Sequence, residues 1–344
     1  MTGAVNAAAG RPTIDDPPPL RPRRRPTGMS AVLLPFHTDG SIAWDAFAAG
    51  IARTAEAGLV PAVNMDTSYG PNLAPATRRR VLAVTAEAVG DRAPVAGWRF
   101  VGGAHVDGAA VSGGQPGLDL AGYKAACVEV AEAGGVPMVF PSAGLAALPD
   151  GQLASTHAEI AGSVDRILGF ELGVQFHPHG RIWTLETYGE VLQIPQVVGS
   201  KHSSLRREPE WARLALRDAR RPGFLVLTGN DLAIDMVRWG SDYLLGLSAF
   251  APAAFARRDG LWAAGDRRAL EVDDALQALG ALAFRDPVPA YRHDAALVWH
   301  RRGWAPSPQV HPASPTRPPG EAELLAALLD RLDAVVAETE SGPA

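Results

Sequence analysis

The sequence predicts an α/β fold, a (β/α)8 TIM barrel followed by a C-terminal helical extension. From Ala31 onward, short apolar runs alternate with segments of helical length, which is typical of repeated βα units around a parallel sheet. Eight such runs can be counted, and eight strands separated by helices favour a closed barrel over an open sheet. No G-x-G-x-x-G motif follows the first run, which argues against a dinucleotide-binding fold.

The predicted elements follow one another in regular order. Each predicted strand is a short apolar run, and the longer segments between the runs carry the helical pattern. The predicted strands are residues 32–36, 60–64, 94–97, 136–141, 172–176, 197–201, 224–228 and 243–247. The predicted helices between them include residues 44–57, 75–89, 120–133, 152–168 and 208–219.

After the eighth run the pattern becomes mainly helical, at residues 266–284, 290–302 and 321–336, with a Pro-rich stretch at 306–319 before the last helix. We therefore expect a disordered N-terminal extension at residues 1–28, the barrel at 29–250 and a C-terminal helical region at 251–340. The N-terminal stretch is rich in Ala, Gly and Pro, and its arginine cluster is interpreted as a solvated arm.

Composition restricts the class of protein. With 344 residues, 47% apolar and 20% charged, the chain can bury a substantial core. The net charge is −5 and the arginines are scattered among acidic residues, so we expect no nucleic-acid partner. No contiguous apolar segment suits a secretory signal or a membrane span. The single cysteine, Cys127, cannot form an intrachain disulfide, and we expect a cytoplasmic location.

Lys201 is the most informative residue, because it is one of two lysines against thirty arginines and it ends an apolar run. Arginine supplies a permanent cation, so a retained lysine suggests chemistry that guanidinium cannot perform. A poorly solvated amine loses its proton and can attack a carbonyl, and a barrel mouth can provide such a site. The alternative is a strand-end ion pair. The other lysine, Lys124, is interpreted as part of a solvated helix face.

Polar residues gather where the predicted strands end, which is where TIM barrels place their active sites. Strand one is followed by His37, strand two by residues 64–70, and strand seven by residues 228–231. Three of the nine histidines, His177, His179 and His202, follow strands five and six.

The order of these segments resembles the dihydrodipicolinate synthase and N-acetylneuraminate lyase superfamily of Schiff-base barrels, over most of residues 30–300. Residues 34–42 look like the family's opening strand and Asp-Gly turn, and residues 63–69 fall at its Gly-Thr-Thr-Gly-Glu carboxylate loop. Residues 196–204 look like its lysine strand, and residues 229–231 and 240–244 resemble its last two strand signatures. The resemblance implies that Lys201 condenses with the ketone of pyruvate or a longer 2-oxo acid, without a bound cofactor, in a homodimer or homotetramer.

The sequence departs from the family pattern in two places. In the carboxylate loop, Thr67 matches the second threonine, but Asp66 replaces the first, Ser68 replaces a glycine and Tyr69 replaces the glutamate. At strand four, Phe-Pro-Ser at 140–142 stands where the family has a proton-transferring tyrosine. Either another group supplies the acid and base, or the family's reaction has been abandoned. We predict Lys201, His177, Asp66 and Tyr69 as catalytic residues, with His177 preferred as the replacement, and Thr67, Ser68, His202 and Leu244 as substrate-binding residues.

Two other readings remain open at this stage. His177, His179, His202 and Asp231 carry groups that suit zinc, which would make the protein a metal-dependent barrel hydrolase. Alternatively, the missing tyrosine and the altered loop indicate a non-catalytic descendant that binds a small oxo acid.

Overall fold

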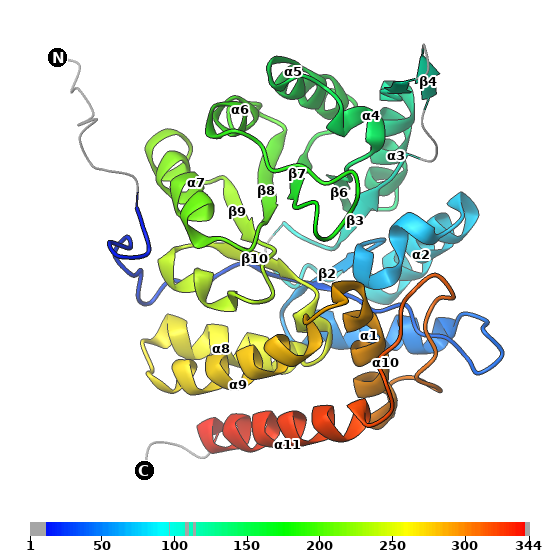
Figure 1. Ribbon diagram of the computed structural model, residues 1–344, viewed down its shortest axis with the longest axis vertical. Helices are drawn as coiled ribbons and strands as arrows, with labels where there is room; N and C mark the ends of the chain where they lie inside the picture. Colours follow the sequence, from blue (N-terminus) through cyan, green and yellow to red (C-terminus); the bar gives the residue numbers. More distant parts are fainter. Residues whose placement is uncertain (1–11, 96, 107–109, 113–114, 341–344) are drawn as a thin grey trace.

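Eight parallel strands close into a barrel in the order β1-β10-β9-β8-β7-β6-β3-β2, as predicted (Figure 1). The structure, a computed structural model, describes residues 12–95, 97–106, 110–112 and 115–340. The barrel strands are β1 Gly28–Ala31, β2 Val60–Val63, β3 Val101–Ala104, β6 Val136–Val139, β7 Ile167–Leu172, β8 Val197–Ser203, β9 Leu225–Thr228 and β10 Asp242–Leu245. Between β3 and the next helix, β4 Ala110–Ser112 and β5 Gln115–Gly117 pair as an antiparallel hairpin.

Helices surround the barrel and cover its outer face (Figure 1). Helix α2 begins with a proline at its first position, where the missing N–H costs nothing, and ends at Gly90 with φ +59°. The side chain of Asp119 caps α3 by accepting from the Gly122 N–H at 2.8 Å. The outer helices are α1 Trp44–Glu56, α2 Pro75–Val89, α3 Leu120–Glu132, α4 Ala143–Ala146, α5 Asp150–Ala161, α6 Leu185–Val191 and α7 Arg207–Arg220.

The chain after β10 is helical, with α8 Pro252–Ala264, α9 Arg268–Ala283, α10 Tyr291–Arg301 and α11 Glu321–Glu340. Helix α9 packs between α8 and α11 (Figure 1). Helix α10 is tied to the barrel end by Trp299, whose indole N–H donates to the carbonyl of Ala249 at 2.8 Å. This contact joins the second half of α10 to the segment after β10, while the hydroxyl of Tyr291 at the start of α10 bonds with Thr67.

Side chains from alternate strand positions fill the barrel interior. Met29, Val60, Met138, Leu168 and Leu244 belong to one buried cluster, and each comes from a different strand. Because strand residues alternate between two faces, the neighbours of these residues face the surrounding helices instead. The same alternation decides which polar side chains at the strand ends can reach a central site.

Three strands lie away from their predicted positions, whereas the other five lie within one to two residues of the predicted ends. The first strand is Gly28–Ala31 instead of 32–36, because the whole run to Phe36 is buried and hydrophobicity alone does not mark where pairing ends. The third is Val101–Ala104 instead of 94–97, since its two glycines weaken the apolar signal. The fifth is Ile167–Leu172 instead of 172–176, because buried Glu171 interrupts the run and the preceding helix was expected to extend to 168.

The expected disorder of residues 1–28 is wrong for the part next to the barrel. Arg24 forms an ion pair of 2.7 Å with Asp242, and the backbone N–H of Arg21 donates to the carbonyl of Arg238 at 2.7 Å. These contacts hold the segment against the N-terminal end of β10, and Gly28 already belongs to β1. Residues 1–11 lie outside the described part of the chain. None of the helices that the structure describes is long and apolar enough to span a membrane.

Candidate active site

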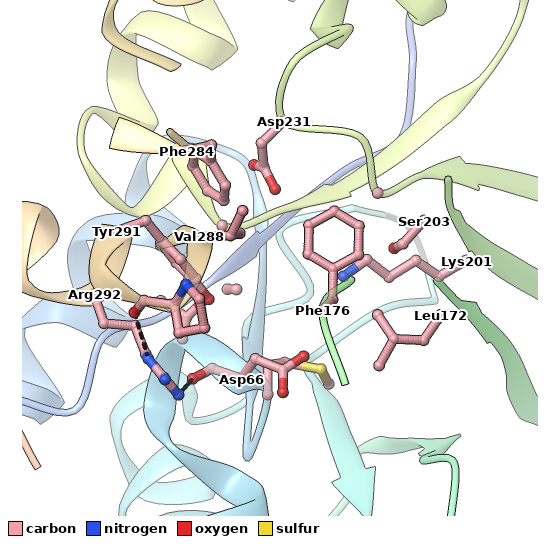
Figure 2. A pocket seen from close by; sticks show the side chains of 16 residues that line it. Asp66, Leu172, Phe176, Lys201, Ser203, Asp231, Phe284, Val288, Tyr291 and Arg292 are labelled. Carbon is pink, nitrogen blue, oxygen red and sulfur yellow. Dashed lines mark hydrogen bonds between the residues drawn. The ribbon is translucent and has the colours of Figure 1, made fainter. Parts of the chain in front are cut away.

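A cavity lies at the barrel mouth, where the C-terminal ends of the strands meet (Figure 2). Its volume is about 60 Å³, which holds roughly four to six water-sized groups and therefore suits a small molecule. The side chains that line it come from the barrel strands, from their loops and from the segment that leads into α10. They are Ala31, Met65, Asp66, Thr67, Leu172, Phe176, Lys201, Ser203, Gly229, Asp231, Gly246, Phe284, Val288, Pro289, Tyr291 and Arg292.

Lys201 enters this cavity from β8. Its Nζ lies 4.6 Å from the centroid of the Phe170 ring. Within the described residues its ammonium group has neither a hydrogen bond nor a carboxylate at salt-bridge distance. A Cβ at position 229 would lie 2.5 Å from Cε of Lys201, so only glycine leaves room for the lysine stem there. The alternative interpretation of Lys201, a strand-end ion pair, is therefore not formed among the described residues.

Burial lowers the pKa of Lys201, while the carboxylates of Asp231 and Asp66 oppose this shift. Burial also raises the pKa of Asp231 to about 6, against the hydrogen bond of 2.7 Å that its Oδ1 accepts from the Leu247 N–H. The cavity therefore combines an amine that releases its proton more readily than an ordinary lysine with a carboxyl group that holds its proton longer than an ordinary aspartate.

Of the four residues that were predicted as site residues in the loop after β2, two line the cavity and two do not. Asp66 and Thr67 line it, as predicted. Ser68 does not, because its Oγ accepts from the Met65 N–H at 2.9 Å and donates to the Met65 carbonyl at 3.2 Å. Ser68 thus closes the short 3₁₀ helix Asp66–Ser68, and its assignment as a substrate-binding residue is corrected.

Tyr69 is likewise outside the set of cavity residues. It takes a left-handed backbone conformation, φ +58°, which turns the ring away into an aromatic cluster. The ring lies 5.6 Å from those of Phe36 and His311, and the guanidinium of Arg292 covers it at 5.3 Å. The ring of Tyr69 is thus packed outside the cavity, so the catalytic role predicted for Tyr69 is not supported.

His177 lies in the loop after β7, beside the cavity but not among the residues that line it. Its Nδ1 accepts from the backbone N–H of His179 at 3.2 Å, and the two imidazole rings meet edge to face. Burial lowers the pKa of His177, and the charge of Asp66 opposes this. The strand ends five residues before His177, so the side chain is not aimed by the barrel as the sequence suggested.

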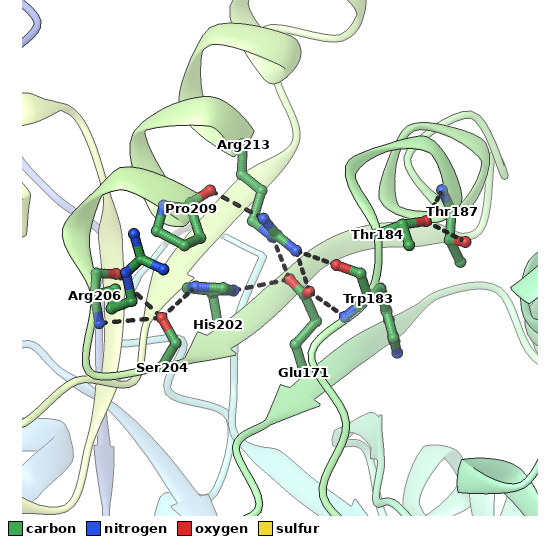
Figure 3. A network of polar contacts seen from close by, with 9 residues as sticks. All are labelled: Glu171, Trp183, Thr184, Thr187, His202, Ser204, Arg206, Pro209 and Arg213. Carbon is green, nitrogen blue, oxygen red and sulfur yellow. Dashed lines mark hydrogen bonds and ion pairs between the residues drawn. The ribbon is translucent and has the colours of Figure 1, made fainter. Parts of the chain in front are cut away.

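His202 points away from the cavity, into a buried polar network between β7, β8 and α7 (Figure 3). Its Nδ1 lies 3.0 Å from Glu171 and its Nε2 lies 2.8 Å from Oγ of Ser204. Arg213 of α7 donates from Nε to the same carboxylate at 2.6 Å. Since Lys201 faces inward, strand alternation sends His202 outward, and the predicted substrate contact is corrected.

Leu244 is also not a substrate contact. It lies in the buried cluster of the barrel interior and is paired in register with Met29 of β1. The cavity is lined instead by Gly246, two residues further along the chain. The side chain of Leu244 therefore belongs to the packed interior of the barrel.

Tyr291 and Arg292, at the start of α10, line the cavity and were not predicted from the sequence. The hydroxyl of Tyr291 forms a hydrogen bond of 2.9 Å with Oγ1 of Thr67. Arg292 donates to the carbonyls of Pro289 at 3.1 Å and Asp66 at 3.3 Å. Across the described chain it has no ion pair with a carboxylate. Both residues lie more than 40 positions beyond the last strand, so no local pattern connects them with the barrel.

The zinc reading is not supported by the geometry. Among the residues described, no group of three or more His, Cys, Asp or Glu side chains could hold a metal ion. His202 is held by Glu171 outside the barrel, while Asp231 lines the cavity inside it. The predicted set of ligands is therefore not brought together.

We compared the chain with protein-family models, with curated proteins and with solved structures. No family model matches this chain, and no curated protein matches it. Solved structures do match. A prophage protein of the dihydrodipicolinic acid synthase family from E. coli, in complex with pyruvate, has a TM-score of 0.75 at 17% identity, over 89% of this chain and 98% of that one.

Dihydrodipicolinate synthase from Thermotoga maritima matches with a TM-score of 0.74 at 16% identity, over 90% of this chain and 99% of that one. The 4-hydroxy-tetrahydrodipicolinate synthase from Methylacidiphilum fumariolicum matches with a TM-score of 0.73 at 18% identity, over 92% and 99%. The resemblance predicted from the sequence is thus confirmed at the level of the fold, over nearly the whole length of these relatives.

Proposed function

We propose that the protein is a Schiff-base-forming lyase, an aldolase or dehydratase, that acts on a 2-oxo acid through Lys201. The observation that carries this proposal is the position of the amine. Lys201 ends in a cavity at the barrel mouth, without an ion-pair partner in the described chain, and burial lowers its pKa. An amine that gives up its proton in a poorly solvated cavity is suited to attack a carbonyl carbon.

The chemistry needs no cofactor. Nζ of Lys201 forms a bond with the ketone carbon, and the ketone oxygen takes a proton to give a carbinolamine. The C–O bond then breaks, water leaves and a protonated imine remains. The imine draws electrons from the neighbouring carbon, so that a C–C bond can be cleaved, or a hydroxyl lost further along the chain, with a nearby group handling the proton.

Arg292 is the group we assign to the carboxylate of the oxo acid. Its guanidinium lines the cavity, and two of its N–H groups are anchored on backbone carbonyls, so its charge is positioned but not neutralised by a carboxylate within the described residues. Asp66 would repel a substrate carboxylate bound beside it. We therefore place the substrate carboxylate toward Arg292 and Thr67.

A chamber beside the cavity supports a proposal about the part of the substrate that lies beyond the reacting carbons. A second chamber of about 380 Å³ adjoins the first and shares Phe176, Asp231, Phe284 and Val288 with it. Its other walls include Leu205 and Leu232, which are 52% and 40% exposed. We propose that the small cavity holds the reacting carbons and that the chamber takes an apolar extension of a longer 2-oxo acid.

Borohydride trapping tests the proposal. Purified protein is incubated with pyruvate, with 2-oxo acids bearing apolar chains and with 2-oxo acids bearing a second charged group, then reduced and analysed by intact mass and peptide mapping. We expect an adduct on Lys201, most readily with the apolar acids. Lys201→Arg should give none. Lys124→Arg is the matched control, because Lys124 is the other lysine and lies on an exposed helix face.

If no acid gives an adduct on Lys201, the lyase proposal is wrong, and a non-catalytic oxo-acid-binding protein becomes the better account. Binding of the same acids, measured by calorimetry without borohydride, would then identify that alternative.

We also propose a homodimer or homotetramer located in the cytoplasm. The support is the resemblance in fold and, for the location, a single buried cysteine with a free thiol. Light scattering during size-exclusion chromatography measures the assembly, and a monomeric mass would exclude it.

A further inference from the structure

The mechanism proposed above needs an acid and a base next to Lys201, and the structure offers a specific group. The segment after β6, Phe-Pro-Ser at 140–142, contains no tyrosine, and the ring of Phe140 meets that of Phe170. Three side chains that line the cavity carry a hydroxyl, namely Thr67, Ser203 and Tyr291. Tyr291 is the only phenol among the lining residues.

Tyr291 is held firmly in place. Its ring stacks on Phe284 with centroids 4.4 Å apart and an interplanar angle of 18°. Its hydroxyl is fixed by the hydrogen bond of 2.9 Å to Thr67. A Cβ at Gly246 would lie 3.0 Å from Cε2 of Tyr291 and 3.4 Å from Oγ1 of Thr67, so this glycine at the end of β10 leaves the space that the pair occupies. Figure 2 shows Tyr291 and Lys201 entering the cavity from opposite sides.

We propose that Tyr291, supplied by helix α10 of the C-terminal region, is the catalytic acid and base of this site. This inference rests on the proposed Schiff-base function and assigns its proton transfers. Thr67 is a positioning residue that holds the phenol hydroxyl.

The proton transfers balance as follows. In the carbinolamine on Lys201, the C–O bond breaks as the phenol of Tyr291 gives its proton to the departing oxygen, which leaves as water. The nitrogen lone pair forms the C=N bond, so a protonated imine and a phenolate remain. The phenolate then removes a proton from the carbon next to the imine carbon, and an enamine forms. Tyr291 is a phenol again at the end of this sequence.

The surrounding charges suit this cycle. Burial raises the pKa of Tyr291 above its ordinary value, and the carboxylates of Asp66 and Asp231 raise it further, against the charge of Arg292 and the Thr67 hydrogen bond. The group is therefore a phenol at neutral pH and can donate its proton. Once it has donated, its phenolate is a strong base beside the acidic carbon of the imine.

Proton exchange isolates this step from imine formation. Pyruvate is incubated with the protein in D2O, and loss of its methyl proton signal is followed by NMR. We expect Tyr291→Phe to slow exchange by about 100-fold or more, the usual contribution of a positioned acid or base, with little change in the pyruvate concentration that gives half-maximal rate. Borohydride should still trap Lys201 in this variant during a long incubation.

Two further variants make the result specific. Tyr69→Phe removes the other tyrosine hydroxyl near the site, and exchange should remain at the wild-type rate because Tyr69 does not line the cavity. Thr67→Val removes the hydrogen-bond partner of the phenol together with the hydroxyl that we place beside the substrate carboxylate, so its exchange rate is compared at saturating pyruvate. It should slow exchange by roughly two- to tenfold there, with Thr67→Ser restoring the rate. These variants keep the Tyr291 ring and its stacking on Phe284.

The outcomes separate the two proposals. If wild-type protein gives no adduct on Lys201, the Schiff-base function itself fails. If Lys201 is trapped in both proteins but Tyr291→Phe exchanges protons as fast as wild type, the lyase proposal stands and the role of Tyr291 is refuted. If Tyr69→Phe slows exchange as much as Tyr291→Phe, the assignment to Tyr291 is also overturned.

Discussion

Arg213 provides the sharpest test of the packing behind the lysine strand. Its guanidinium and the carboxylate of Glu171 are both buried, with 3% and 0% of their side chains exposed. Arg213 donates to Glu171 from Nε at 2.6 Å, and also to the carbonyls of Trp183 at 2.8 Å and Pro209 at 2.9 Å. Replacement of Arg213 by Met keeps most of the apolar stem and removes the charge and all of these donors.

The size of the effect follows from the carboxylate left behind. Burial alone would raise the pKa of Glu171, but the charges of Arg213 and His202 and their hydrogen bonds lower it from 4.5 to about 2. That difference corresponds to about 3 kcal/mol of stability. It is present above the unfolded-state pKa of about 4.5 and is lost as the pH falls toward 2. Removing one partner of a buried pair typically costs about 3–5 kcal/mol, which is what we expect for Arg213→Met at pH 7.

The assay is urea unfolding followed by tryptophan fluorescence at pH 7 and at a pH below 4.5, where the contribution of Glu171 in the wild-type protein should fall. Arg301→Met is the matched control, since Arg301 pairs with Asp330 at 2.9 Å on the surface and should cost less than about 1 kcal/mol. The double variant Glu171→Gln with Arg213→Met should recover about 2 kcal/mol or more, because no charge is left unpaired. An Arg213→Met protein within 1 kcal/mol of wild type would refute the reasoning.

Three predictions concern the cavity. The rate of borohydride trapping on Lys201 should rise with pH and reach half its maximum below 10.5, because burial lowers the pKa of the amine; a midpoint at or above 10.5 contradicts this. Asp231→Asn should move that midpoint to lower pH, since the carboxylate favours the ammonium form, and an unchanged or higher midpoint would exclude the coupling. Arg292→Met should raise the KM for a 2-oxo acid by about ten- to 100-fold while barely changing trapping by an uncharged ketone; equal effects on both would remove Arg292 from carboxylate binding.

The barrel could be predicted because its signal is repeated. Eight apolar runs and the helices between them are each weak, but their alternation leaves few other folds. The positions of two strands were mispredicted because each buried strand contains residues that are unusual in a strand. Val101–Ala104 contains two glycines, and Ile167–Leu172 contains Glu171, whose charge is acceptable in the core only because Arg213 arrives from α7.

The site could be predicted in part. Lys201, Asp66 and Thr67 reach the cavity, since residues at strand ends are aimed there by the barrel. The prediction that His202 binds substrate failed for a reason that the sequence already contains. His202 is the neighbour of an inward-facing lysine, and the alternation of side chains along a strand turns it outward. The roles predicted for Tyr69 and Ser68 failed because the backbone of their loop turns these side chains away from the cavity. Residue type alone does not predict that backbone conformation.

Tyr291 and Arg292 show what single-sequence reasoning cannot reach. Their place at the mouth depends on how α10 packs against the end of the barrel, a contact between residues far apart in the chain, such as Trp299 and Ala249. The cavity draws residues from both sides of the expected boundary at position 250, so the C-terminal helices complete the site as well as covering the barrel. Because Tyr291 lines the same cavity as Lys201, a helix outside the barrel can supply a phenol to a site whose strand ends supply none.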